Sequence, residues 1–464
     1  MPLATKCYNC RNNMEGEIKM KERSIKRITE IPGEKSRKLK EIAERHVASG
    51  SMYSMFPIVA AEAKGAIIKD VDGNSYIDFY AGVGVLNLGH CHPKVLEAAK
   101  AQAEKLVHTC FGSVMQEPFI RVAERLSEIT PGKFPKATAL FNSGSEAIEN
   151  SIKISRAYTK RPAVICFDYA FHGKTLLATS LDGTVRPLKV GYGPFVPEIY
   201  RFPVAYCYRC PFGLSYPDCC MRCLEFIKQG FLTTVDPEQV AVLVIEPVIG
   251  EGGYIFPPKE FLPGLQEICR EHGIVFVLDE VQSGFGRTGK MFACEHWGVV
   301  PDLMVMSKSI ANGFPLSAVT GRKEIVNAAG ILGGTFVGHP VGCAAALAVF
   351  NIFEEEKILQ KAQRMAEIMR SRLGKMYRSI PLIGDLRGID TAWGIELVRD
   401  KKTKEPATEE TKRVLNECLK SGLIAIKAGV YGNVIRIIPP LVITEEQLNE
   451  GFDILEEALI KVSG

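Results

Sequence analysis

Five short apolar runs alternate with longer segments of helical pattern through the middle of the chain. Each run is continuous and rich in residues that favour strands, as expected for a strand buried on both faces. Strands of this kind separated by helices are typical of an α/β domain with a largely parallel sheet. The runs are Ala137–Phe141, Ala163–Phe167, Ala241–Ile245, Ile274–Leu278 and Leu303–Met306.

Each apolar run leads directly into a polar, glycine-rich or ionisable stretch. Ligands of open α/β sheets bind outside the carboxyl ends of the strands. We therefore expect five strands to deliver side chains to one edge of the sheet. The stretches read, in chain order, NSGSE, DYAFHGKT, Glu246-Pro247, DEVQSGFG and Ser307-Lys308.

The two ends of the chain show other patterns. The polar N-terminal part predicts a helical extension, and short strands with a hairpin at Asp72–Asn74 follow it. The C-terminal part combines helical patterns with the strand-like segment IRIIPPLVIT. We expect an extension at residues 1–50, a small α+β domain from residues 51–100 and 346–464, and a large domain at residues 101–345.

Composition and charge narrow the classes of function. The chain has 464 residues, 46% of them hydrophobic, and a net charge of +4, which is too small to indicate nucleic-acid binding. No apolar run reaches the length of a membrane span. The N-terminal MPLATKCYNCRNN lacks the hydrophobic core of a signal peptide, so a cytoplasmic protein is expected.

Two of the strand ends carry groups suited to binding an anion or a cation. Ser143 and Glu146 have capping-box spacing, and Gly144 and Ser145 at a helix start offer N–H groups and a hydroxyl to a phosphate. A well-capped helix without a ligand fits the same residues. Asp279 is costly to bury unless a cation pairs with it. A structural ion pair is the alternative.

Two further strand ends carry an amine and an aromatic ring. Lys308 can act as an amine nucleophile if its ammonium form is destabilised, although an ordinary loop lysine is the simpler interpretation. Phe171, next to His172, can stack on a planar cofactor or pack in the core. Together these strand ends offer a phosphate-binding helix start, an aromatic ring for stacking, an amine that can form an imine, and a carboxylate. These are the groups that pyridoxal phosphate (PLP) requires.

One motif points to a different cofactor. Gly284, Gly286 and Gly289 spell the G-x-G-x-x-G pattern of a dinucleotide site after a strand. The following segment, KMFACEHWGVVP, is short and ends at a proline, so it makes a poor phosphate-binding helix. A nicotinamide dehydrogenase is therefore the weaker hypothesis.

From Phe56 to the C-terminus, ordered motifs resemble the class III, fold-type I PLP-dependent aminotransferases, above all the 4-aminobutyrate aminotransferase branch. The resemblance implies a large domain with a mostly parallel sheet and a smaller α+β domain. The motifs are DFYAGVGVLNLGHCHP, NSGSEAIENSIKISRAYTKR, FHGKT, IEPVIGEGGY, VLDEVQSGFGRTGK, SKSIANGFPLSAV, GGTFVGHPVGCAAALAV and RIIPPLVIT.

The resemblance also implies roles around the cofactor. Lys308 would carry PLP as a Schiff base and shuttle a proton, and Asp279 would pair with the pyridine nitrogen. Thr335 would reach the phosphate of a partner subunit's cofactor, implying a homodimer or a dimer of dimers. The remaining cofactor contacts implied are Gly144, Ser145, Phe171, His172 and Gln282.

For the substrates, the resemblance implies transfer from 4-aminobutyrate or a similar omega-amino acid to 2-oxoglutarate. Arg436 would bind the α-carboxylate of glutamate, and Glu251 would mask that charge for the other substrate. Lys174 stands where such enzymes typically have arginine, and Val83 occupies a substrate-lining position. Racemases and epimerases of the same fold branch share the cofactor residues and remain the alternative.

A cluster of cysteines lies between two of the predicted strands. It reads C-x-x-C, eight residues, then C-C-x-x-C, within an insertion at residues 204–224. The spacing suits a structural metal, and a loop of reduced thiols fits it equally. No cofactor residue lies inside it, so we expect scaffolding. The cysteines are Cys207, Cys210, Cys219, Cys220 and Cys223, with a further C-x-x-C at Cys7 and Cys10.

Overall fold

A computed structural model describes residues 24–51 and 56–464, and its largest element is a seven-stranded sheet. Only β10 runs opposite to the others, so six strands point their carboxyl ends to one edge. In spatial order the strands are β4 (Lys136–Phe141), β10 (Ser317–Arg322), β9 (Leu303–Met306), β8 (Val275–Asp279), β7 (Val240–Ile245), β5 (Ala163–Phe167) and β6 (Ile199–Phe202).

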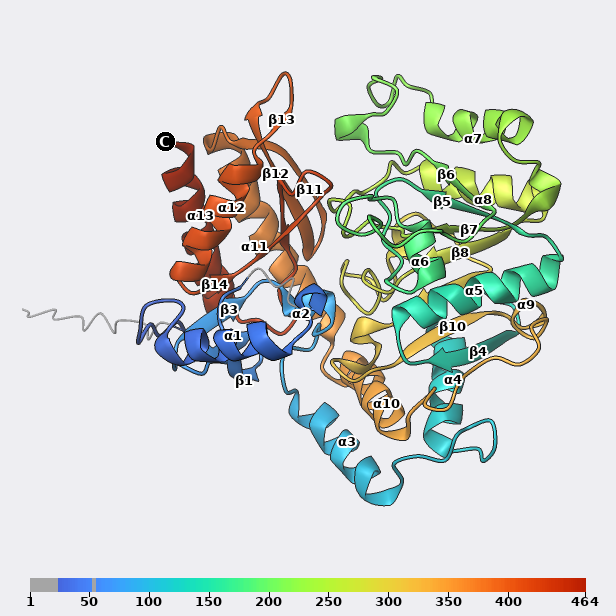
Figure 1. The fold of residues 1–464 in the computed structure, drawn as a ribbon, viewed down its shortest axis with the longest axis horizontal. Helices are drawn as coiled ribbons and strands as arrows, with labels where there is room; N and C mark the ends of the chain where they lie inside the picture. The colour runs from blue at the N-terminus through green and yellow to red at the C-terminus, as the bar shows by residue number, and fades with distance from the viewer. Residues whose placement is uncertain (1–23, 52–55) are drawn as a thin grey trace, which may run out of the picture.

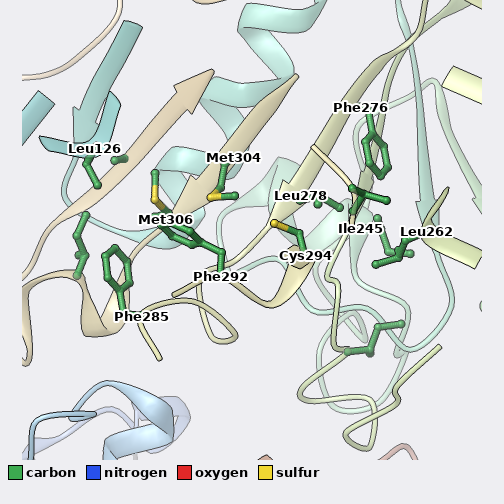
Figure 2. Packing of buried hydrophobic residues seen from close by; sticks show 14 of the residues in the cluster. Leu126, Ile245, Leu262, Phe276, Leu278, Phe285, Phe292, Cys294, Met304 and Met306 are labelled. Atoms are coloured by element: carbon green, nitrogen blue, oxygen red, sulfur yellow. The ribbon is translucent and has the colours of Figure 1, made fainter. Parts of the chain in front are cut away.

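Both faces of the large sheet are buried, which confirms the prediction from the continuous apolar runs. Leu278 and Phe276 of β8 pack into one cluster, and Val275 and Val277 into the cluster on the opposite face. Figure 2 shows the first of these clusters around Leu278, Phe276 and Ile245. The helices of this region are α4 (Glu117–Ile129), α5 (Gly144–Thr159), α6 (Leu176–Leu181), α7 (Arg222–Thr233), α8 (Phe261–His272), α9 (Lys323–Val326) and α10 (Pro340–Glu355).

The N- and C-terminal segments together build a second lobe. Strand β3 pairs in parallel with β14, joining Ile77 to Leu423 across the chain. Figure 1 shows the blue and red ends of the chain together on the left. Its elements are α1 (Glu34–His46), β1 (Ala60–Lys64), β2 (Ile67–Asp70), β3 (Ser75–Asp78), α2 (Ala81–Gly84), α11 (Ile358–Ser379), β11 (Ile383–Ile389), β12 (Ala392–Asp400), β13 (Glu405–Pro406), α12 (Thr408–Lys420), β14 (Leu423–Ile424), β15 (Ile426–Ala428), β16 (Val434–Ile437) and α13 (Glu445–Ser463).

Two helices run across the domain limits expected at residues 100 and 345. Helix α3 (Pro93–Lys105) crosses the limit at residue 100 and packs against α10. Helix α10 continues without a break through residue 345. The limits therefore stay a prediction, and part of the expected extension, residues 1–23 with Cys7 and Cys10, lies outside the described residues. Within the described residues, no helix is long and apolar enough to cross a membrane.

The core of the large sheet offers a test of this packing. Leu278 is fully buried, and Leu278→Ala removes apolar contacts and leaves a cavity. We expect the free energy of unfolding to fall by about 2–5 kcal/mol, measured by urea denaturation. Leu232→Ala, at a position 87% exposed in α7, is the matched control and should change it by less than about 0.5 kcal/mol. Equal losses in both variants would contradict the proposed core.

Candidate active site

Ionisable side chains converge at the carboxyl edge of the large sheet, as the strand pattern predicts. Asp279 is the last residue of β8, and Lys308 lies two residues after β9. Glu246 directly follows β7, His172 follows β5, and Ser145 lies in the first turn after β4. These strands run in the same direction, so five segments far apart in the chain meet at one edge.

The start of α5 forms a capped helix end at this edge. Ser143 is the N-cap, and its hydroxyl accepts a hydrogen bond from the Glu146 N–H at 3.3 Å, as its spacing predicts. The Glu146 carboxylate turns instead to the Asn142 N–H, at 2.8 Å. A side chain at Gly144 would lie 3.2 Å from Val281, so only glycine fits without a shift. The Ser145 hydroxyl accepts from the Lys174 N–H at 3.2 Å.

The buried Asp279 pairs with His172. Asp279 Oδ2 lies 2.8 Å from His172 Nδ1, and Asp279 Oδ1 accepts from the Val281 N–H at 3.0 Å. The His172 N–H donates to Asp182 at 2.7 Å. Although burial opposes it, the hydrogen bond and charge of Asp279 raise the pKa of His172. His172 Nε2 is buried without a hydrogen-bond partner in the described structure.

Glu246 is a site residue that the sequence interpretation did not assign. Its carboxylate accepts hydrogen bonds from the Phe171 N–H at 2.9 Å and the Gly250 N–H at 3.0 Å. It thus holds the segment that carries the candidate stacking ring. Burial, and then the neighbouring Asp279 charge, raise the pKa of Glu246. Its position after the fully apolar β7 was the signal that could have identified it.

Lys308 begins a short 3-10 helix, Lys308–Ala311, in a left-handed backbone conformation with φ of 48°. A non-glycine residue there carries strain of the kind found at functional sites. Burial lowers the pKa of Lys308, Arg436 adds to the effect, and Glu251 and Asp279 oppose it. A larger share of neutral amine at a given pH follows, which favours nucleophilic and base chemistry.

Arg436 and Glu251 form an ion pair close to Lys308. Arg436 Nη1 donates to Glu251 Oε1 at 2.8 Å, with the arginine side chain fully buried and the glutamate 36% exposed. Arg436 Nε and Nη2 are buried and have no hydrogen-bond partner among the described residues. Although burial raises it, the Arg436 charge and hydrogen bond lower the pKa of Glu251. The guanidinium therefore retains donors for a second carboxylate.

Of the remaining predicted site residues, Gln282, Val83 and Lys174 lie at the site, whereas Thr335 lies away from it. Gln282 Nε2 donates to the Val83 carbonyl at 3.4 Å, and Gln282 Oε1 is buried without a partner in the described structure. Val83 is left-handed, with φ of 66°, which is unusual for a β-branched residue. The Lys174 charge acts on Glu251. Thr335 lies in an exposed turn before α10, and none of the contacts above includes it.

The glycine motif does not form a dinucleotide site. Gly286 and Gly289 have positive φ values of 82° and 81°, and the segment after them forms only the 3-10 helix Ala293–His296. A side chain at Gly286 would lie 2.7 Å from Phe353, so packing accounts for that glycine. A nicotinamide site would need a helix start that this segment lacks.

The cysteines of the insertion 204–224 gather at one place. Four of its five cysteines line one small cavity, and Cys220 is exposed outside it. Burial and then the neighbouring thiols raise the pKa of Cys207 to about 11, which keeps it protonated at neutral pH. Among residues 24–51 and 56–464, no three Cys, His, Asp or Glu side chains are arranged to hold a metal. The four are Cys207, Cys210, Cys219 and Cys223.

Comparison with known proteins shows the same fold and family. The model of the family "Aminotransferase class-III" matches residues 48–459. A probable 4-aminobutyrate aminotransferase of Bacillus subtilis is 45% identical over 86% of this chain and 92% of its own length. A 5-aminovalerate aminotransferase of Pseudomonas aeruginosa is 43% identical over 86% of this chain and 93% of its own length. An amine transaminase from an uncultivated Pseudomonas species, solved with PLP bound, superposes with a TM-score of 0.82 at 28% identity, covering 90% of this chain and 97% of that chain.

The fold and its edge site are those of an α/β transferase that acts on amino groups. The chain belongs to the class III aminotransferases. Its reaction is therefore transamination between an amino acid and an oxo acid. Each relative named above is an aminotransferase or transaminase, so the racemase or epimerase alternative is not supported.

The Asp279–His172 pair leads to a direct electrostatic test. Asp279→Asn removes the hydrogen bond and negative charge that most favour the imidazolium, so that burial is opposed only by the smaller effects of the Glu246 and Asp182 charges. We expect the pKa of His172 to fall below its ordinary value of about 6.5, followed by an NMR titration of the labelled imidazole. Asp218→Asn, at an exposed position, is the control and should leave it unchanged. An unaltered His172 pKa in Asp279→Asn would contradict the assigned pairing.

Proposed function

We propose that this aminotransferase uses PLP to move the amino group of 4-aminobutyrate, or a similar omega-amino acid, to 2-oxoglutarate. The observation that carries the proposal is Arg436, which is buried and pairs through one nitrogen with Glu251, while its other two nitrogens have no hydrogen-bond partner among the described residues. Such a fork suits the α-carboxylate of glutamate or 2-oxoglutarate. The names of the relatives from Bacillus subtilis and Pseudomonas aeruginosa support the omega-amino donor.

The residues at the sheet edge fit PLP. The N–H groups and hydroxyl at Gly144 and Ser145 suit its phosphate, and the Asp279 carboxylate suits its ring nitrogen. Gln282 Oε1 is buried and has no partner in the part of the chain that the structure describes, so its amide can meet the ring hydroxyl. The remaining contacts proposed are the Phe171 ring on one face, His172 behind Asp279, and Lys308 as the point of attachment.

Lys308 is proposed as the group that moves the proton. Bound PLP supplies an electron sink that stabilises negative charge on the substrate carbon bearing the amino group. The Lys308 amine would carry the proton from that carbon to the cofactor in the first half of the reaction, and would carry a proton back to the substrate carbon in the second half. Its lowered pKa suits this role, since a base must be neutral to accept a proton.

Glu251 and Arg436 are proposed to let one site accept two kinds of acid. Glutamate and 2-oxoglutarate carry an α-carboxylate that takes the remaining donors of Arg436, and Glu251 moves aside because two carboxylates beside one guanidinium repel each other. An omega-amino donor has no carboxylate at that carbon, so Glu251 remains on Arg436 and neutralises its buried charge. The partial exposure of Glu251 leaves it room to move.

Lys174 and Val83 are proposed to bind the far end of the donor. The Lys174 charge acts on Glu251, which supports its place at this site. Lysine supplies a point charge without the planar fork of arginine, so it holds a distant carboxylate with less directional preference. Thr335 is proposed to reach the cofactor phosphate of a second subunit, which makes the working unit a homodimer or a dimer of dimers.

The function is tested by incubating the PLP-loaded protein with 4-aminobutyrate and 2-oxoglutarate and measuring glutamate. We expect glutamate formation, and a loss of about 10²- to 10⁴-fold in Lys308→Ala. Borohydride should fix the cofactor on Lys308, located by peptide mapping. Lys323→Ala, at an exposed lysine, is the control. Glutamate formation from 5-aminovalerate alone would change the donor, and failure of borohydride to label Lys308 would contradict the mechanism.

The proposed binding of an α-carboxylate by the Arg436 guanidinium can be tested separately. Arg436→Lys keeps the positive charge that pairs with Glu251 but loses the second donor to an α-carboxylate. We expect the KM for glutamate to rise about 10- to 100-fold, because a charge-assisted hydrogen bond is worth about 1.5–3 kcal/mol. The KM for the omega-amino donor should change much less in the same steady-state assay. Equal increases for both substrates would argue against the role proposed for Arg436.

A further inference from the structure

We propose that Arg387 is a positioning residue for Glu251, and that the cysteine-rich insertion holds Arg387 in place. The inference rests on the proposed function of the Glu251–Arg436 pair and extends it to residues with no role in the site described above. It concerns the sheet of the second lobe with the strand order β11-β12-β16-β15, called here the small-domain sheet. It assigns to this sheet and to the insertion a part in choosing between the two kinds of substrate.

Glu251 belongs to a tight turn, and Arg387 forms hydrogen bonds with the other end of that turn. The turn closes through hydrogen bonds from the Gly253 and Tyr254 N–H groups to the Gly250 carbonyl, at 3.2 and 3.1 Å. Arg387 Nε donates to the Gly253 and Tyr254 carbonyls, each at 3.0 Å, and Arg387 Nη2 donates to Gly253 at 2.5 Å. The guanidinium thus fixes the backbone two and three residues beyond Glu251.

Arg387 and Arg436 lie in one row across the small-domain sheet. Arg387 of β11 is opposite Gly394 of β12, and Gly394 is opposite Arg436 of β16. Directly opposite residues of antiparallel strands point to the same face, so both arginines flank the glycine. A side chain at Gly394 would lie 2.9 Å from Tyr254 Cβ. The missing side chain therefore makes room for the turn between the two arginines.

The orientation of Arg387 depends on a buried carboxylate. Glu396, on β12, is 1% exposed and lies 2.7 Å from Arg387 Nη1, which also pairs with Asp385 at 2.5 Å. Although burial raises it, the charge of Arg387 and the contacts of Tyr206 and Arg209 lower the pKa of Glu396. An ionised carboxylate in this position fixes the plane of the guanidinium.

The insertion supplies the other half of the Glu396 environment. The Tyr206 hydroxyl donates to Glu396 Oε2, and Arg209 Nε donates to Glu396 Oε1 at 2.5 Å. Arg209 Nη2 reaches the Lys404 carbonyl at 2.8 Å, and Lys404 Nζ returns a hydrogen bond to the Tyr208 carbonyl at 2.6 Å. The first residues of the insertion are therefore tied to the small-domain sheet behind the Glu251 turn.

If Arg387 no longer holds the Glu251 turn, the two half-reactions should be affected unequally. These are the reaction of the cofactor with the omega-amino donor and its reaction with glutamate. The omega-amino half-reaction needs Glu251 held on Arg436, whereas the glutamate half-reaction needs Glu251 displaced. For Arg387→Met we expect kcat/KM for 4-aminobutyrate to fall about tenfold, within the roughly 100-fold that a 1 Å misplacement can cost. The kcat/KM for glutamate should stay within about twofold of the wild type, as expected when only one state loses its support.

The test measures each half-reaction alone, by the single-turnover change in cofactor absorbance with 4-aminobutyrate or with glutamate. Arg399→Met, which removes an exposed arginine of the neighbouring strand, is the matched control and should change neither rate. Tyr206→Phe removes one hydroxyl of the insertion and should shift the same ratio in the same direction by a smaller factor. It also provides the test if Arg387→Met does not fold.

A double-mutant cycle with Glu251→Gln decides whether Arg387 acts through Glu251. If it does, Arg387→Met should add almost nothing to the loss caused by Glu251→Gln. Additive losses, or equal losses in both half-reactions, would overturn the proposal and leave Arg387 a purely structural residue. A wild-type protein that does not react with 4-aminobutyrate or 5-aminovalerate would instead refute the proposed donor, whatever the variants do.

Discussion

Charge cannot be placed inside a sheet that is buried on both faces, and this constraint shapes the whole active site. The middle strands of the large sheet are apolar along their length, so ionisable groups appear only where those strands end. There they must compensate one another, because water is largely excluded. Asp279 is matched by His172 and Glu251 by Arg436, whereas Glu246 relies on two backbone N–H groups.

At three of the residues proposed to bind cofactor or substrate, buried polar atoms have no hydrogen-bond partner among the described residues. His172 Nε2, Gln282 Oε1 and two nitrogens of Arg436 lack hydrogen-bond partners in the described structure. Buried polar groups are otherwise almost always paired. The unpaired atoms belong to residues that come from three separate segments around Lys308. A site that is balanced in charge but incomplete in hydrogen bonds is ready for a polar ligand.

The local pattern of apolar and polar residues was sufficient to predict the strands and the residues at their ends. It was not sufficient to predict which side chains pair with those residues. The apolar runs correctly predicted β4, β5, β7, β8 and β9, and with them the positions of Asp279 and Lys308. Strand β10, which runs antiparallel, and the short edge strand β6 were missed. The need for a partner beside the buried Asp279 could be predicted, whereas the choice of His172 depends on the order of strands in space. Arg436 and Glu251 were found only through family resemblance, because an ion pair between distant segments joins them. Arg387 was not found at all, because only the sheet register places it beside Arg436.

The pairing of β3 with β14 has a consequence for the order of events during synthesis. Ile77 emerges from the ribosome long before Leu423, its neighbour in the sheet. At about 5–20 residues per second, the N-terminal strands wait roughly 20–70 s for their C-terminal partner. The whole large sheet is made in that interval and can form first. The lobe that contributes Arg436 is therefore completed last, so a nascent chain acquires the edge proposed to hold the cofactor before the arginine proposed to recognise an acid.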